Sequence, residues 1–440
     1  MNKFTCAMLT AAAVLAAPAL ASAQSLTPWG AEAGPNADGS IPAWSGSPSA
    51  DTIPNGVFTN PFAGDQPLFR IDQSNVDQHA SKLSPGQIAM IKRYDTYFLP
   101  VYPTRRIYDL PANIIADAQA EAGGISSNAQ GSGLNGINKS LLPFPRPTEG
   151  IHLVWNHILR YQGASYQRNY AQAPVQSNGA YTLQRLRDFI TFRPTLLKTN
   201  PAENENVLLK FLQVILAPAR LEGNVLLVHD TLDQLKDKRG AWVYNAGQRR
   251  VRRAPNIVYD GPGTAAEGMR TTDDFGMFNG SPDKYNWVLK GKREMYVPAN
   301  SFALADGNLS YDDAIGQKHL NQEHTRYELR RVWEVEGNLK DGERHIYGKR
   351  VFFFDEDGNY IALADQYDNR GELWRFKEGH TAMASKQKIL TYVGEPIHDL
   401  QAGKYLVLGL VSEERPQFKY NLDLDDSDYT PAALRRLGRK

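Results

Sequence analysis

The stretch that decides the fold is RVFFFDEDGNYIALAD, residues 350–365. Two apolar runs flank Asp357-Gly358-Asn359, and a glycine in such a turn accepts positive φ at no steric cost, so the stretch predicts a β-hairpin. Side chains alternate along a strand, so Phe352 and Phe354 share one face and their apolar neighbours occupy the other. A strand that is apolar on both faces must be covered twice. Either a filled sandwich core or an apolar cavity satisfies that requirement.

Outward from this hairpin, short apolar or alternating runs follow one another from about residue 152 onward. They are separated by turn signals such as Asp341-Gly342, and no regular helices intervene, which is typical of antiparallel meanders. The fold class is therefore predicted as mainly β with a few helices, built on one large antiparallel sheet that is curved or closed. The clearest predicted strands are 208–216, 224–229, 241–245, 286–289, 327–336, 344–355, 360–365, 372–377, 388–393 and 404–411.

The first half of the chain has a different character. Residues 24–75 are rich in Gly, Pro, Ser, Asn and Asp, which favours an extended, turn-filled segment lying on something else. Ser84-Pro85-Gly86-Gln87 predicts a helix start, with Ser84 as N-cap and Gln87 completing a capping box. A second helix is expected over 113–122. We expect three parts: 1–23, 24–150 packed on the sheet, and the sheet itself over 151–440.

The N-terminus predicts export. Lys3 precedes an apolar run, residues 9–17, that is too short to span a bilayer, and Ala21-Ser22-Ala23 supplies the small residues that a signal peptidase reads. We expect cleavage after Ala23 and a periplasmic protein; a membrane anchor is the alternative. Cleavage also removes Cys6, the only cysteine, so the mature chain has no disulfide and no thiol.

Composition and motifs exclude several function classes. Loss of Lys3 leaves 48 basic against 48 acidic residues, a balance that gives no reason to expect nucleic-acid binding. No Gly-x-Ser-x-Gly elbow or phosphate-binding loop occurs. The group His319-Leu320-Asn321-Gln322-Glu323-His324 lacks the spacing of helical zinc sites. We therefore expect no catalytic residues, no metal and no cofactor, and predict that the protein is not an enzyme.

The most unusual stretch is Trp242 to Pro255, WVYNAGQRRVRRAP, with four arginines around one valine. If it is extended, Arg250 and Arg252 share one face, while Arg249 and Arg253 share the other. Such a cluster can bind phosphate or carboxylate groups or an acidic partner. The alternative is that nearby acids pair with the arginines.

This stretch resembles the signature of a proteobacterial periplasmic family of unknown function that is related to outer-membrane lipoprotein-sorting proteins of the LolA and LolB group. The resemblance runs from about Leu26 to the C-terminus. It includes 26–32, 36–44, 101–106, 143–145, 155–157, 211–220, 347–350, 355–357, 364–368 and 371–375.

The resemblance implies a curved half-barrel closed by helices or loops over an apolar cavity, and a carrier or chaperone for a lipid or other hydrophobic molecule between the two membranes. It also implies a link to an export system, with an inner-membrane exporter of the resistance-nodulation-division type and an outer-membrane protein as partners. Because an acyl chain in water costs about 0.8 kcal/mol per methylene, the cavity must offer apolar side chains. The candidates for its lining are Trp242, Tyr244, Trp287, Trp333, Phe352, Phe354 and Trp374, with Arg250 and Arg252 at the mouth.

Two other readings stay open. An adaptor between exporter and outer membrane, carrying no cargo, predicts a core filled by side chains and an interaction surface around the arginine run. A hydrolase acting on envelope components requires a cleft with converging titratable groups. The chain is also about twice the length of a lipoprotein-sorting protein, so residues 24–150 have no counterpart there and are expected to cap or fill the cavity.

Overall fold

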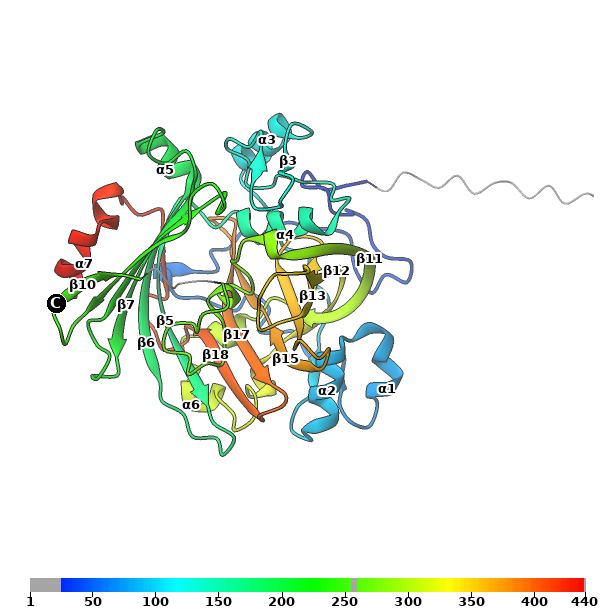
Figure 1. Cartoon of the computed structure of the whole chain (residues 1–440). Helices are drawn as coiled ribbons and strands as arrows, with labels where there is room; N and C mark the ends of the chain where they lie inside the picture. The colour runs from blue at the N-terminus through cyan, green and yellow to red at the C-terminus, as the bar shows by residue number, and fades with distance from the viewer. Residues whose placement is uncertain (1–24, 255–258, 439–440) are drawn as a thin grey trace, which may run out of the picture.

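The structure is a computed structural model that describes residues 25–254 and 259–438. It is mainly β, as predicted, and is dominated by one large curved antiparallel sheet (Figure 1). The predicted signal peptide, residues 1–23, lies outside the described residues. Within the described part of the chain, no helix is both long and apolar enough to cross a membrane.

The elements have the following bounds. The α-helices are α1 (Val76–His79), α2 (Pro85–Arg93), α3 (Ala112–Glu121), α4 (Gly150–Leu159), α5 (Arg193–Thr199), α6 (Tyr311–Ala314) and α7 (Pro431–Leu437). The strands of the first part are β1 (Phe69–Ile71), β2 (Leu99–Val101), β3 (Ser126–Ser127) and β4 (Leu134–Asn135). The others are β5 (Ser165–Val175), β6 (Gln184–Phe192), β7 (Val207–Ala217), β8 (Val225–Thr231), β9 (Gly240–Asn245), β10 (Arg250–Arg253), β11 (Tyr285–Pro298), β12 (Tyr327–Leu339), β13 (Lys349–Asp355), β14 (Ile361–Tyr367), β15 (Leu373–Glu378), β16 (His380–Ala384), β17 (Ile389–Asp399), β18 (Lys404–Leu410) and β19 (Phe418–Tyr420).

Antiparallel pairing makes the sheet continuous. It runs from β10 through β9, β8, β7 and β6 to β5, crosses to β18 and β17, and continues through β15, β14, β13 and β12 to β11. Strand β19 shares β5 with β18, and β16 shares β17 with β15. From the first part of the chain, β1 pairs with β2, which joins the start of β12 through the parallel pair Tyr327 and Val101.

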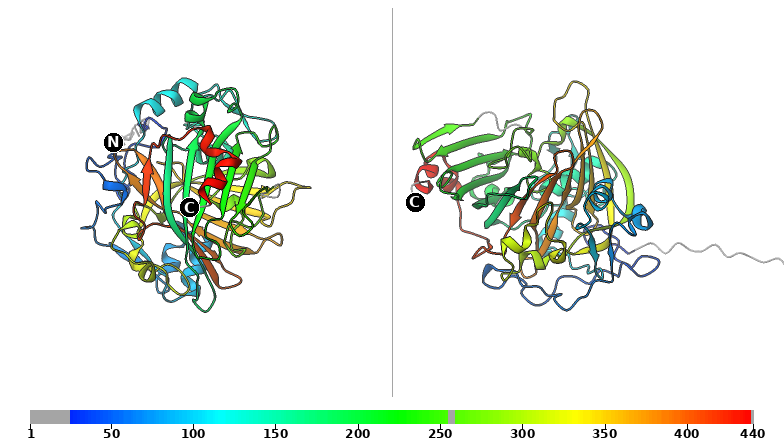
Figure 2. Two further views of the ribbon diagram at one scale, coloured as in Figure 1. Left: turned by 90° about the vertical axis from the view of Figure 1, so that its left-hand side faces the viewer. Right: turned by 90° about the horizontal axis from the view of Figure 1, so that it is seen from below.

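The sheet has two limbs, one made of β5–β10 and the other of β11–β18 (Figures 1 and 2). Following the strand pairs shows that Arg168, Glu395 and Phe352 face the same side of the sheet, which we call the concave face. The C-terminal helix α7 packs on the opposite, convex face of the first limb, where Leu434 joins an apolar cluster. Residues 259–281, which we call the cover segment, lie on the concave face.

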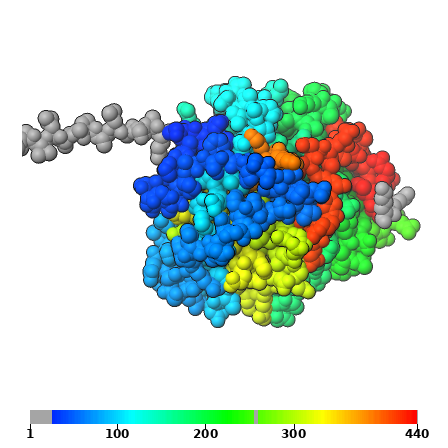
Figure 3. Space-filling view, turned by 180° about the vertical axis from the view of Figure 1, so that it is seen from behind, coloured from blue at the N-terminus to red at the C-terminus, as the bar shows by residue number. Residues whose placement is uncertain are grey.

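The residues before α4 pack on the sheet, and Figure 3 shows the N-terminal segment spread over the back of the molecule. Trp29 is buried against Trp44 and Tyr108, with ring centroids 5.2 and 5.4 Å away. Arg106 reaches the hairpin loop at the centre of the molecule and pairs with the buried Asp357 at 2.6 Å. This segment therefore contributes to the core as well as to the surface.

All ten predicted strands are present, and the strand Lys349–Asp355 is covered on both faces, as its two-sided apolar pattern requires. Helix α2 begins with the predicted capping box between Ser84 and Gln87. In the loop after β13, however, Asn359 rather than the glycine before it takes the positive φ, +51°.

Candidate functional site

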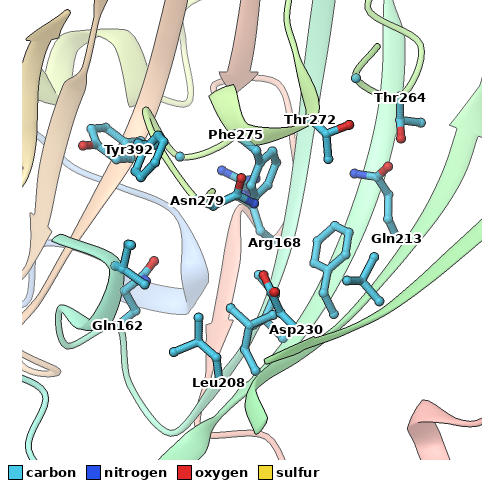
Figure 4. Close-up of a pocket in the computed structure, with 18 of the residues that line it drawn as sticks. Gln162, Arg168, Leu208, Gln213, Asp230, Thr264, Thr272, Phe275, Asn279 and Tyr392 are labelled. Carbon is cyan, nitrogen blue, oxygen red and sulfur yellow. The ribbon is translucent and has the colours of Figure 1, made fainter. Parts of the chain in front are cut away.

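A cavity lies between the concave face of the β5–β10 limb, the cover segment and β17 (Figure 4). The cavity has a volume of about 150 Å³ and is open to solvent at its mouth. Pockets for drug-sized ligands measure roughly 300–1,000 Å³, so a cavity of this volume holds a smaller apolar group, and a longer molecule would extend through the mouth. The residues that line it are Ile158, Arg160, Gln162, Tyr166, Arg168, Ile190, Phe192, Leu208, Leu209, Phe211, Gln213, Leu226, Val228, Asp230, Arg239, Pro262, Gly263, Thr264, Arg270, Thr272, Phe275, Gly276, Phe278, Asn279, Thr391, Tyr392 and Glu395.

An apolar row crosses the floor of this cavity. The strand register places Tyr166 beside Ile190, Ile190 beside Phe211, and Phe211 beside Val228. Because side chains alternate along each strand, these four residues share the concave face. Phe211 is only half-buried, and Phe275 of the cover segment packs against it with ring centroids 5.7 Å apart. Tyr166, Ile190 and Val228 are buried, so Phe211 is the residue of this row whose apolar surface stays partly uncovered.

A polar row runs beside it, one pair of residues further along the strands. Arg168 on β5 pairs with Asp188 on β6 at 3.0 Å, and Gln213 on β7 donates hydrogen bonds to Asp188 at 3.0 Å and to the hydroxyl of Tyr170 at 2.8 Å. Burial raises the pKa of Asp188, although Arg168 opposes the shift. Along the same line of paired residues, two apolar side chains, Leu226 and Val243, separate these polar groups from Arg252 on the edge strand β10.

A second ion pair lies at the opposite end of the cavity. Arg239 binds Asp230 through two hydrogen bonds of 2.9 and 2.8 Å, and it also donates to the backbone oxygen of Asn279 at 2.8 Å. Both charged side chains are buried. The pair therefore neutralises its own charge and ties the cover segment to β8.

The cover segment is fastened to the other limb by buried charges. Asp273 pairs with Arg350 at 2.7 Å, and Asp274 pairs with Lys377 at 3.0 Å. Burial alone would raise the pKa of Asp274, but Lys377 and Arg350 together hold it well below its usual range. The backbone N–H of Met277 donates to Glu395 on β17 at 2.9 Å. These contacts fix residues 273–277 over the cavity.

Four of the seven predicted lining residues face the concave side but are covered there. Phe352 and Phe354 are fully buried, and the cover segment's Phe278 lies 5.5 Å from Phe352 between ring centroids. Trp287 stacks on Phe352 and donates its indole N–H to a backbone oxygen. Trp333 lies under the ammonium group of Lys292. Phe352 and Phe354 belong to the apolar core, Trp287 and Trp333 pack against it, and none of the four lines the cavity.

The other three predicted lining residues lie elsewhere. Trp242 and Tyr244 face the convex side, where they pack in the cluster that includes helix α7. Trp374, near the start of β15, donates to Asp399 at 3.0 Å. The seven aromatic candidates thus do not line the cavity described here, and the aromatic side chains that do are Tyr166, Phe192, Phe211, Phe275, Phe278 and Tyr392.

The arginine run forms the turn and edge strand that follow β9. Arg250 and Arg252 face the concave side, and Arg253 faces the convex side, as alternation predicts. Arg249 occupies the turn, with a φ of +53°. All four arginines are exposed, and within the described residues none forms an ion pair with the acids expected to neutralise them. Their role as an anion or partner contact stays a prediction.

Sequence reasoning missed the lining residues Tyr166, Arg168, Ile190 and Phe192 because it missed the two strands that carry them, β5 and β6. Both strands place charged side chains, Arg168 and Asp188, at positions that face the interior. An inward-facing ion pair breaks the apolar alternation by which strands are recognised. The signal that remained was the arginine and aspartate at matching positions of two successive β-prone segments.

A family described as "Protein of unknown function (DUF1329)" matches residues 70–435. The chain is similar to the uncharacterized protein PA3922 of Pseudomonas aeruginosa, with 50% identity over 431 residues, which is 97% of this chain and 94% of that protein.

Solved structures are also similar. A DUF1329 family protein from Desulfovibrio piger has 15% identity and a TM-score of 0.42, over 62% of this chain and 92% of its own. A putative outer membrane lipoprotein-sorting protein domain from Vibrio parahaemolyticus gives the same values. A LolA superfamily protein from Nitrosomonas europaea has 14% identity and a TM-score of 0.39, over 64% and 98% of the two chains.

Proposed function

We propose that this chain, which belongs to the DUF1329 family of proteins of unknown function, binds a hydrophobic molecule in the cavity under the cover segment and carries it through the periplasm. The periplasmic setting rests on the export signal predicted over residues 1–23. The proposal contains no catalytic step, and the protein acts by holding its cargo away from water.

One observation carries this proposal. Leu209, Phe211, Leu226 and Phe275 point into the cavity from three elements, yet each is only half-buried. Apolar surface gains about 25 cal/mol per Å² when it leaves water, so surface left uncovered at the centre of a sheet is a site for an apolar ligand. The charged anchors of the cover segment hold the rim in place while the floor stays open.

The adaptor alternative requires a core filled by side chains. The β11–β15 half of the concave face is filled in that way, with Phe278 packed on Phe352. The β5–β8 half contains the cavity, which favours a carrier. A partnership with an inner-membrane exporter and an outer-membrane protein stays a prediction, and the exposed arginine run is the surface on which it would be tested.

The proposal is tested with the mature chain purified from a bacterial periplasm. Native mass spectrometry and solvent extraction should find a bound apolar molecule, and the fluorescent hydrophobe N-phenyl-1-naphthylamine should bind at a ratio near one. Leu226→Trp should abolish dye binding because the indole fills the cavity. The matched control is Leu235→Trp, since Leu235 is 57% exposed and lies outside the lining. A protein without cargo that takes up no dye refutes the proposal.

A further inference from the structure

The charges around the cavity are not balanced. Four arginines and two carboxylates line it: Arg160, Arg168, Arg239, Arg270, Asp230 and Glu395. Two of the arginines are neutralised, because Arg239 pairs with Asp230 and Arg168 pairs with Asp188 on the neighbouring strand β6. Among the described residues, no carboxylate oxygen lies within 4.0 Å of either remaining arginine.

Arg270 is the more isolated of the two. It is only 5% exposed, and within the described residues its guanidinium forms one hydrogen bond, to the backbone oxygen of Thr271 at 3.3 Å. Its Nε has no partner among the described residues. Burial lowers the pKa of Arg270, as expected for a guanidinium without a counter-ion. A buried, unpaired cation is strongly unfavourable unless an anion comes to it.

Arg160, which directly follows helix α4, is the other unpaired arginine of the lining. Its Nη1 donates to the backbone oxygen of His157 at 2.6 Å, and the guanidinium lies 5.4 Å from the ring centroid of Tyr392. Both contacts are with neutral groups, so its charge is not neutralised.

Glu395 does not restore the balance. One of its oxygens accepts the N–H of Met277, while Oε1 has no partner in the described part of the chain. Burial raises the pKa of this carboxyl, which favours the neutral acid. Even with Glu395 ionised, two unpaired cations face one unpaired anion.

The cations also adjoin the apolar floor. Phe275 has the guanidinium of Arg168 5.3 Å from its ring centroid and that of Arg270 at 5.7 Å, and its ring packs on Phe211. The Nε of Arg168, like that of Arg270, lacks an acceptor within the described structure. Two donors without acceptors therefore lie beside an apolar surface, which is the arrangement that an amphiphile with an acidic head would fill.

Building on the carrier function proposed above, we infer that the cargo is an anionic amphiphile whose oxyanion head binds at Arg270 and Arg168 beneath the cover segment. Its apolar body lies along the row of Phe211, Ile190 and Val228. A carboxylate and a phosphate monoester share this chemistry, because both accept charge-assisted hydrogen bonds from guanidinium groups.

Matched ligands separate the head from the body. Dodecanoic acid, dodecyl phosphate and 1-dodecanol have the same chain and are compared by displacement of N-phenyl-1-naphthylamine from the full mature protein. A charge-assisted hydrogen bond is worth roughly 10- to 100-fold in affinity, so at least one acid should bind about tenfold or more tightly than the alcohol. The acid that binds more tightly identifies the source as a free fatty acid or a phosphate-headed lipid.

Variants locate the head. Arg270→Met should remove the preference for the acid and leave the affinity for 1-dodecanol unchanged. Arg168→Lys provides a second lining variant if Arg270→Met does not fold, because it keeps the charge opposite Asp188, removes the Nε donor and should weaken acid binding. Arg344→Met, at an exposed loop position, is the control. Equal affinity of the acids and the alcohol overturns the inference while leaving the carrier function intact. Failure of all three ligands and the dye to bind overturns both, and an acid preference that survives in both lining variants refutes the assigned site.

Discussion

Replacing Lys377 by methionine should loosen the cover segment. Lys377 is fully buried on β15, and its ammonium group donates three hydrogen bonds into that segment: to the carboxylate of Asp274 at 3.0 Å, to its backbone oxygen at 3.0 Å, and to the backbone oxygen of Met277 at 2.8 Å. Methionine has a similar length but carries no charge and no donor. The substitution therefore removes the anchor without leaving a large void.

The expected magnitude follows from these contacts. Hydrogen bonds to charged groups contribute about 1.5–3 kcal/mol each, which sets an upper bound of roughly 4.5–9 kcal/mol for three. Desolvation of the ammonium opposes this gain, and burial accordingly lowers the pKa of Lys377 despite Asp274. Removing one partner of a buried pair typically costs about 3–5 kcal/mol. Because Asp274 keeps its bond to Gln366 at 2.7 Å, we expect a loss near about 3 kcal/mol.

Urea denaturation measures the global loss, and hydrogen exchange over residues 271–279 measures local opening of the cover segment. A double-mutant cycle with Asp274→Asn isolates the coupling between the two charges. Lys404→Met is the control, because Lys404 is half-buried at the start of β18 and forms no ion pair in the described structure. A loss below about 1 kcal/mol, or a coupling near zero, would show that this pair does not hold the segment in place.

Three further outcomes are expected. Burial raises the pKa of Asp365 to about 7. Between about pH 4 and 7 the folded protein therefore holds a proton that the unfolded chain releases. The free energy of unfolding should fall as pH rises through that window. In the Asp365→Asn variant, the decrease in the free energy of unfolding between pH 5 and 8.5, measured with urea, should be smaller by roughly 2–4 kcal/mol. The same pH dependence in the variant and in the wild-type protein would contradict this prediction. Leu434→Ala should lower the free energy of unfolding in urea by about 2–5 kcal/mol, because Leu434 is fully buried between α7 and the convex face. A decrease below about 1 kcal/mol would mean that α7 is loosely attached. Gly86→Ala should lower the free energy of unfolding by about 1–3 kcal/mol, because the added methyl group would collide with the ring of Phe376. The melting temperature should fall accordingly, and an unchanged melting temperature would argue against close packing of α2 on β15.

The sequence determined much of the architecture because its signals are local. Turn residues and apolar runs identified ten strands, and Ser84 and Gln87 marked the start of α2. The two-sided apolar strand at 349–355 required two covering layers, and the structure supplies them. Alternation also grouped side chains correctly, since Phe352 and Phe354 share a face and Trp242 lies with Tyr244.

Alternation cannot say which of the two faces is concave, because a strand pattern is the same whether a given set points inward or outward. Only the tertiary structure decided that Trp242 and Tyr244 face α7, and that Phe352 is covered by Phe278. The tertiary structure also brought together Arg168, Arg270 and Glu395, each of which lies more than a hundred residues from the next in the sequence. Local propensity and periodicity act within about ten residues, so the sequence specifies strands and their faces, whereas a cavity and its charge balance arise only when distant strands and a covering loop meet.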